Sequence, residues 1–162
     1  MSDVERSIDG VAKTVAGVLA NQKYSIDYYQ REYKWESKQM AELVADLTTK
    51  FLDLYEPDHA RKDVANYPGY YLGSIIISQK GSEPFIVDGQ QRLTSLTLLL
   101  TFLRRLQQDR VDKVDVDPLI FSEKFGEKSF NLDVVDRNVC MSALFEQGGY
   151  DPKPDEPESV HT

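Results

Sequence analysis

Cysteine and histidine are scarce in this chain, and their scarcity excludes several kinds of site. Cys140 is the one cysteine among 162 residues, so no disulfide can form within the chain, and we expect a cytoplasmic protein. Cys140 lies on the apolar face of a predicted helix, where packing in the core is a more ordinary role than nucleophilic chemistry. The two histidines, His59 and His161, lie in predicted loops and show no metal-ligand spacing.

Long apolar runs and an excess of basic residues are also missing. No apolar stretch is long enough to span a bilayer, and residues 1–6 lack the pattern of a signal peptide, so we expect no membrane association. The chain has 19 Lys and Arg against 27 Asp and Glu, a formal net charge of −8. This balance argues against binding duplex nucleic acid through a general basic surface, although it allows a small basic cleft.

Several familiar catalytic patterns are absent as well. The sequence has neither a Walker A pattern, GxxxxGK[ST], nor a GxSxG nucleophile elbow. It also offers no clear cluster of carboxylates for two metal ions, so a nuclease centre ranks lowest among the functions considered.

The pattern of apolar residues predicts one α+β domain. Helices are predicted over residues 7–20, from a Ser37 cap to about 54, over 90–109, and from an Asp136 cap to Gly148. Strands are predicted over residues 24–26, 70–78, 85–87 and 130–135. We expect residues 75–77 to be buried on both faces, residues 70–87 to form a hairpin, and residues 57–69 and 111–118 to be loops. We place the domain at 1–150 and interpret 151–162 as an acidic, proline-rich linker or truncated end of a longer protein.

The most informative stretch is residues 88–92, Asp-Gly-Gln-Gln-Arg, at the junction of a predicted strand and the leucine-rich helix. The first turn of a helix has free N–H groups and a positive dipole end, so it suits an anion. With Asp88 as the cap, Gly89 would begin the helix and Arg92 would offer a fork for phosphate oxygens. Gln90 and Gln91 add donors, and the Asp88 carboxylate could bind Mg²⁺. A capped helix with a polar first turn facing solvent explains these residues equally well.

Two further segments could border the same site. In the aromatic segment 28–35, Arg31 can pair with phosphate and Tyr33 or Trp35 can stack on a base, whereas the alternative is a loop anchored on the core by its rings. Gly73, within a predicted strand, indicates a bulge or the close approach of another backbone or of a ligand, and Ser74 could donate to that ligand. A simple strand irregularity fits Gly73 and Ser74 as well.

Three motifs together resemble a known family. Residues 26–35 resemble its "iPxYQRxYxW" element, with Asp27 in place of the usual proline, residues 71–75 resemble its "LGSI" strand, and residues 88–94 contain its DGQQR signature. The family is the DGQQR-motif, ParB/sulfiredoxin-like domain at the N-terminus of GmrSD-type modification-dependent restriction enzymes and related phage-defence proteins. The resemblance covers residues 8–105 and, more weakly, 129–149.

The resemblance implies a fold, an activity and a set of site residues. It implies a small mixed sheet packed with helices, with the DGQQR turn between a strand and a central helix. It also implies Mg²⁺-dependent binding and hydrolysis of a nucleoside triphosphate that regulates an HNH-type nuclease domain in cis or trans. In some members this domain senses modified DNA. The matching catalytic positions are Asp88, Gln90, Gln91 and Arg92. The matching nucleotide-binding positions are Gln30, Arg31, Tyr33, Gly73, Ser74, Gly89 and Thr94.

We therefore expect an NTP-binding, NTP-hydrolysing regulatory domain of a DNA restriction or phage-defence protein. The chain has no HNH-like histidine cluster, so we expect the nuclease domain to lie outside it. The alternative is a non-catalytic module that senses modified DNA or docks a partner protein. The preferred base, the DNA modification and the oligomeric state stay open.

Overall fold

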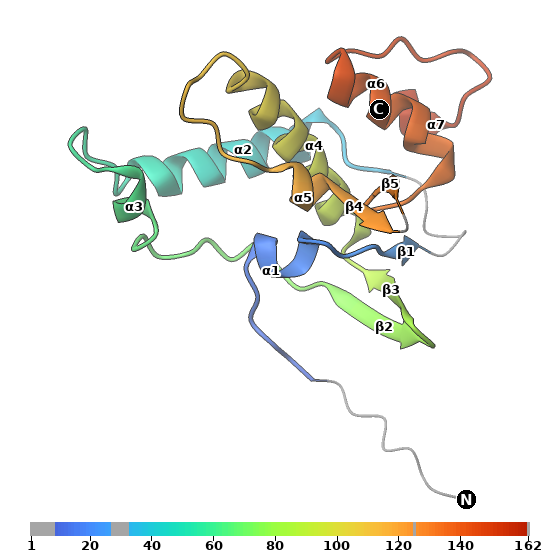
Figure 1. Ribbon diagram of the computed structural model, residues 1–162, viewed down its shortest axis with the longest axis horizontal. Coiled ribbons are helices and arrows are strands. Elements are labelled where there is room, and N and C mark those ends of the chain that lie inside the picture. Colours follow the sequence, from blue (N-terminus) through green and yellow to red (C-terminus); the bar gives the residue numbers. More distant parts are fainter. Residues whose placement is uncertain (1–8, 27–32, 125, 162) are drawn as a thin grey trace, which may run out of the picture.

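A small mixed sheet and a long helix form the centre of an α+β fold (Figure 1). The computed structural model describes residues 9–26, 33–124 and 126–161. The strands β1 (Ser25–Ile26), β3 (Glu83–Asp88) and β2 (Ile76–Lys80) lie side by side in that order. β3 pairs parallel with β1 and antiparallel with β2, so the mixed sheet and a hairpin are confirmed. The first strand of this hairpin is Ile76–Lys80 rather than the predicted 70–78. A separate antiparallel hairpin joins β4 (Phe121–Lys124) to β5 (Glu127–Phe130).

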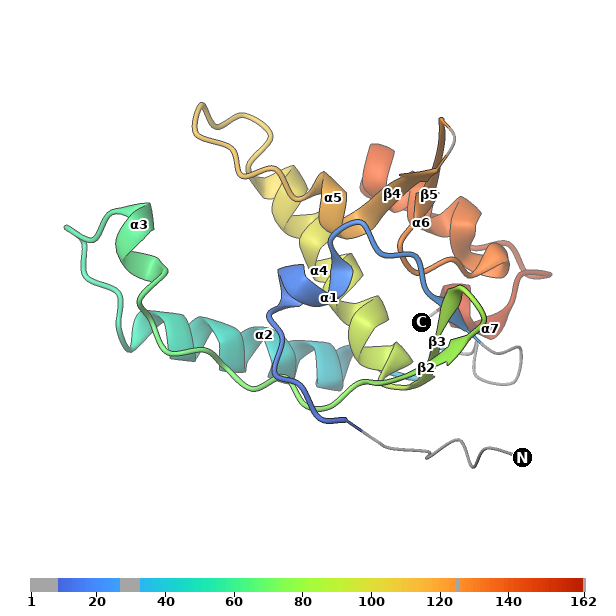
Figure 2. The ribbon, with the colours of Figure 1, turned by 60° about the horizontal axis from the view of Figure 1, so that its bottom comes forward.

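Helices account for most of the remaining regular structure. They are α1 (Val15–Leu19), α2 (Ser37–Leu52), α3 (Arg61–Val64), α4 (Gln90–Leu106), α5 (Asp117–Ile120), the 3₁₀ helix η2 (Val135–Arg137), α6 (Asn138–Glu146) and α7 (Glu158–His161). Figures 1 and 2 both show α3 and the C-terminal end of α2 projecting away from the sheet. Among the described residues, no helix combines the length and apolar character needed to cross a bilayer.

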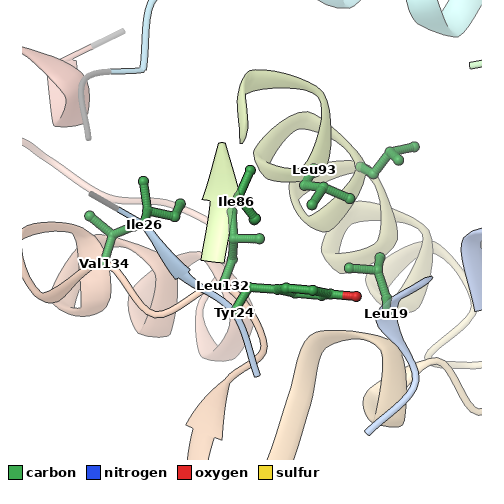
Figure 3. Packing of buried hydrophobic residues seen from close by; sticks show 8 residues of the cluster. Leu19, Tyr24, Ile26, Ile86, Leu93, Leu132 and Val134 are labelled. Atoms are coloured by element: carbon green, nitrogen blue, oxygen red, sulfur yellow. The ribbon is translucent and has the colours of Figure 1, made fainter. Parts of the chain in front are cut away.

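The hydrophobic core lies where α4 crosses the sheet. Ile86 of β3 and Leu93 of α4 are each 1% exposed, and Figure 3 shows them together with Ile26 and Tyr24. Burial of each such side chain contributes about 1.5–3 kcal/mol, so this cluster fixes α4 on the sheet. The second half of α4 is different, because Phe102 is 58% exposed. The predicted central position of this helix therefore holds for its N-terminal half.

Contacts across the chain join the N-terminal segment to residues near 131. The Tyr24 N–H donates to the Asn131 carbonyl over 2.8 Å, and Tyr24 forms an isolated parallel bridge with Leu132. The buried Asn131 side chain donates to the Leu19 carbonyl over 2.8 Å. The strand predicted at 130–135 is therefore replaced by the end of β5, this bridge and the turn of η2.

Three predicted helix boundaries differ from the structure. The first predicted helix is only α1, because Thr14 caps it by accepting the Gly17 N–H over 3.0 Å. Ser37 is the first residue of α2, and Glu36 is its cap. Asp136 lies within η2, so α6 begins later, at Asn138.

The predicted loops and the predicted buried strand also differ in places. The stretches 57–69, 111–118 and 151–162 contain α3, the start of α5 and α7. Ile76 and Ile77 are 50% and 39% exposed, because β2 is an edge strand rather than one covered on both faces. The domain boundary at residue 150 stays a prediction.

Candidate functional site

The turn between β3 and α4 is built on a left-handed glycine. β3 ends at Asp88, Gly89 has φ 92° and ψ 8°, and α4 begins at Gln90. A Cβ on Gly89 would lie 3.0 Å from Cγ1 of Ile75 and 3.2 Å from its Cα. Only glycine adopts this backbone at little cost and leaves room for Ile75.

The helix cap predicted from the sequence is therefore wrong. Asp88 was expected to cap α4 with Gly89 as the first helical residue, whereas Gly89 occupies the cap position and no side chain caps the helix. The reason is that Asp88 is still paired with Ile76 in the sheet, so the chain has to turn at the next residue.

The predicted catalytic residues lie around one cavity of about 260 Å³. Its wall is formed by Trp35, Val87, Asp88, Gly89, Gln90, Gln91 and Arg92. The first turn of α4 carries no acidic residue, so its N–H groups and the Arg92 guanidinium give the cavity a positive side. Asp88 contributes a carboxylate to the wall of the same cavity. The arrangement can accept an anionic group and offers one carboxylate to a cation.

Arg92 is held in place by the segment that contains Gly73 and Ser74. Its Nη1 donates to the Ser74 carbonyl over 2.7 Å, and a Cβ on Gly73 would lie 2.7 Å from the Arg92 Cζ. Gly73, at φ 100°, therefore lets the guanidinium pass close to the backbone. The group that approaches Gly73 is this side chain, whereas the sequence predicted a bulge or the approach of another backbone or of a ligand. The partner of Arg92 in this hydrogen bond is a neutral carbonyl rather than a carboxylate.

The two glutamines have different surroundings. Gln91 Oε1 accepts the Lys34 N–H over 2.8 Å and so fastens the segment before α2 to the first turn of α4. Gln90 Oε1 is buried and has no hydrogen-bond partner within the described part of the chain. A buried acceptor without a partner costs about 1–3 kcal/mol, so Gln90 is ready to accept a hydrogen bond from a ligand or water.

Tyr33 and Thr94, both predicted to bind nucleotide, line a second cavity of about 160 Å³. Tyr33 is 8% exposed, and its hydroxyl lies 2.8 Å from Ser95 Oγ. Ser95 in turn donates to the Gln91 carbonyl, so Tyr33 is the donor in this chain of hydrogen bonds. Burial raises the pKa of Tyr33, which keeps its hydroxyl protonated. Trp35 borders both cavities, so the two lie next to each other.

Gln30 and Arg31 lie outside the described residues. The structure instead adds a residue that sequence analysis missed, Arg137, which also lines the second cavity. It is 6% exposed, and its Nη1 lies 3.5 Å from Thr94 Oγ1. Burial lowers its pKa from the ordinary value. Its immediate neighbours in the sequence, Asp136 and Asn138, are polar, so no local pattern marks Arg137 as a buried residue.

Metal-binding groups are sparse in the described structure. Residues 9–26, 33–124 and 126–161 contain no group of three or more His, Cys, Asp or Glu side chains that could hold an ion. Asp88 is the carboxylate that lines the cavity at the start of α4. A single carboxylate fits Mg²⁺ that enters the site bound to the phosphates of a ligand, because such an ion needs only one or two protein carboxylates.

Comparison with known proteins identifies the family. A search of curated proteins finds no match to this chain. The family model described as "GmrSD restriction endonuclease, N-terminal domain" matches residues 15–159, a range that includes the whole wall of the first cavity and all of the second except Val160. The chain therefore belongs to the family of N-terminal domains of GmrSD restriction endonucleases, proteins of DNA restriction systems.

Proposed function

We propose that this domain binds a nucleoside triphosphate at the first turn of α4 and hydrolyses it to regulate a nuclease domain. The observation that carries the proposal is the cavity at residues 88–92. There the uncapped N-terminus of α4, Arg92 and the acidic residue Asp88 line the same cavity.

The phosphates would lie against the backbone N–H groups of α4 and the guanidinium of Arg92. A helix N-terminus carries the equivalent of roughly half a positive charge, and Arg92 adds a full one. Arg92 is already fixed by its 2.7 Å hydrogen bond to Ser74, so little side-chain entropy is lost when an anion binds. Both features favour a polyphosphate over a neutral ligand.

Hydrolysis requires a residue that holds water and a way to neutralise charge. Gln90 suits the first role better than Gln91, because Gln91 Oε1 already accepts the Lys34 N–H. Asp88 would hold Mg²⁺ together with the phosphates, and the ion would neutralise the charge on the phosphate oxygens. The nuclease would be an HNH-type domain elsewhere in the restriction protein. Modified DNA would be the signal to which the restriction protein responds.

Calorimetric titration with each Mg-NTP tests the binding site. We expect Arg92→Ala to lower the affinity at least tenfold, because a charge-assisted hydrogen bond to phosphate contributes roughly 1.5–3 kcal/mol. The matched control is Arg110→Ala, which removes an exposed arginine that pairs with Asp112 and does not line either cavity. Equal affinity for Arg92→Ala and wild type would reject the assignment. Phosphate release, measured with and without modified DNA, then tests hydrolysis.

An exposed apolar surface favours a second candidate function, the docking of a partner protein. Phe102, Leu103 and Leu106, on the second half of α4, are 58%, 45% and 63% exposed. Such a surface is typical of interaction sites rather than of isolated domains. A pure docking module would bind a partner without releasing phosphate, so the same phosphate-release assay separates the two functions.

A further inference from the structure

The cavity beside the DGQQR turn combines apolar walls with two charged residues. Its rings and apolar side chains include those of Tyr33, Trp35, Met40, Leu98, Met141 and Leu144. Its charged wall residues are Glu36 and Arg137. At about 160 Å³ it is smaller than pockets for drug-sized ligands, which span roughly 300–1,000 Å³. Its size and walls suit a single flat ring system rather than a phosphate chain.

Arg137 is the unusual member of this cavity. It is 94% buried, and neither its Nε nor its Nη2 has a hydrogen-bond partner among the described residues. Its two near neighbours also line the cavity, since Nη1 lies 3.5 Å from Thr94 Oγ1 and Cζ lies 5.9 Å from the centre of the Tyr33 ring. Two unpaired N–H groups on a buried guanidinium are costly, so a ligand that supplies acceptors for Nε and Nη2 would be stabilised here.

The position of the cavity connects it to the proposed phosphate site. Thr94 lies four residues after Gln90 on α4, a rise of about 6 Å along one face of the helix. Gln90 borders the first cavity, Thr94 borders the second, and Trp35 borders both. One nucleotide could therefore reach both cavities, with its phosphates at the turn and its base beside Arg137.

We infer that the second cavity holds the base of the bound nucleotide and that Arg137 selects bases with a carbonyl oxygen on the edge it faces. The inference rests on the proposed nucleotide-binding function. Arginine has only donors, so it pairs well with the O6 and N7 acceptors of guanine or hypoxanthine. The N6 amino group of adenine is itself a donor and would leave a guanidinium N–H unpaired. Tyr33 and Trp35 supply rings on which a base can stack.

Inosine triphosphate and ATP form a matched pair for the test, because their purines differ at position 6. Hypoxanthine, the base of inosine, bears oxygen there, and adenine bears an amino group. Calorimetric titration of wild type should give about tenfold tighter binding of the inosine nucleotide. In Arg137→Met this ratio should fall to about 1, while the affinity for inorganic tripolyphosphate stays as in wild type. Arg137→Lys keeps the charge but loses the fork, so it should also lose most of the preference.

The outcomes separate this inference from the function on which it rests. Equal affinity of wild type for the two nucleotides, a preference for ATP, or a preference that survives in Arg137→Met would overturn the role of Arg137 even if tripolyphosphate binds. Failure of wild type to bind both nucleotides and tripolyphosphate would overturn the nucleotide site itself. Circular dichroism shows whether Arg137→Met folds. If it does not, the affinities of wild type and of Arg137→Lys for inosine triphosphate and ATP still test the role of Arg137.

Discussion

Replacing Gly89 by alanine tests how tightly the turn between β3 and α4 is built. The φ of 92° is unfavourable for a residue with a Cβ, which costs about 1–2 kcal/mol. The new Cβ would also lie 3.0 Å from Cγ1 and 3.2 Å from Cα of Ile75, and crowding of this kind costs about 1–3 kcal/mol. Since a backbone atom is involved, rotation of a side chain cannot relieve the crowding fully. We expect the free energy of unfolding to fall by about 2–5 kcal/mol.

Gly81→Ala is the matched control for this experiment. Gly81 also has a positive φ, 67°, but no atom lies within 4 Å of a Cβ placed on it. Urea denaturation should therefore show a loss of only about 1–2 kcal/mol for the control. Equal losses for the two variants would refute the claim that Ile75 closes over the turn. Gly89→Ala should also weaken tripolyphosphate binding, because the first N–H groups of α4 would shift.

Two further predictions concern side chains fixed by single contacts. Gly73→Ala would place a Cβ 2.7 Å from the Arg92 Cζ, so the guanidinium should move away from the Ser74 carbonyl. Calorimetric titration should then show weaker binding of tripolyphosphate. Unchanged affinity would contradict this role of Gly73. The hydrogen bond of Tyr150 to Glu156 raises the pKa of the tyrosine to about 12 and lowers that of the carboxyl from 4.5. The lowered carboxyl pKa stabilises the fold above pH 4.5, and this contribution is lost as the pH falls through the folded value. Glu156→Gln should therefore bring the Tyr150 pKa down toward 10 in an ultraviolet absorbance titration, and a pKa that stays near 12 would show that the contact is absent in solution.

The strand, turn and helix at residues 83–106 could be predicted from the sequence because their signals are local. Three apolar residues, an Asp-Gly pair and a leucine-rich period of 3.6 residues all lie within one short stretch. The identity of the cap could not be predicted, because Asp and Gly are both good residues at a helix start. The choice depends on the pairing of Asp88 with Ile76, which is a contact between two strands.

Burial of the isoleucines was harder to predict for the same reason. A continuous apolar run is typical of a strand covered on both faces, yet Ile76 and Ile77 are on the edge strand β2 and are partly exposed. Whether a strand is central or at an edge depends on which strands pair, and periodicity carries no information about pairing.

The second cavity could not be predicted from the sequence at all. It joins Tyr33, Thr94 and Arg137, which are separated by 61 and 43 residues along the chain and meet only through folding. The family resemblance placed Tyr33, from the motif at 26–35, and Thr94, from the motif at 88–94, in a single nucleotide site with residues 88–92. In the structure these two residues border a cavity of their own, next to the DGQQR turn.

The central claim is that the first turn of α4 binds the phosphates of a nucleotide, and amide chemical shifts test it most directly. In a ¹H–¹⁵N NMR titration with inorganic tripolyphosphate, the amides of residues 89–92 should shift most, and those near Leu106, at the opposite end of the helix, should stay unchanged. The Arg92→Ala variant should lose these shifts. Shifts that are absent, or that cluster away from residues 89–92, would contradict the account.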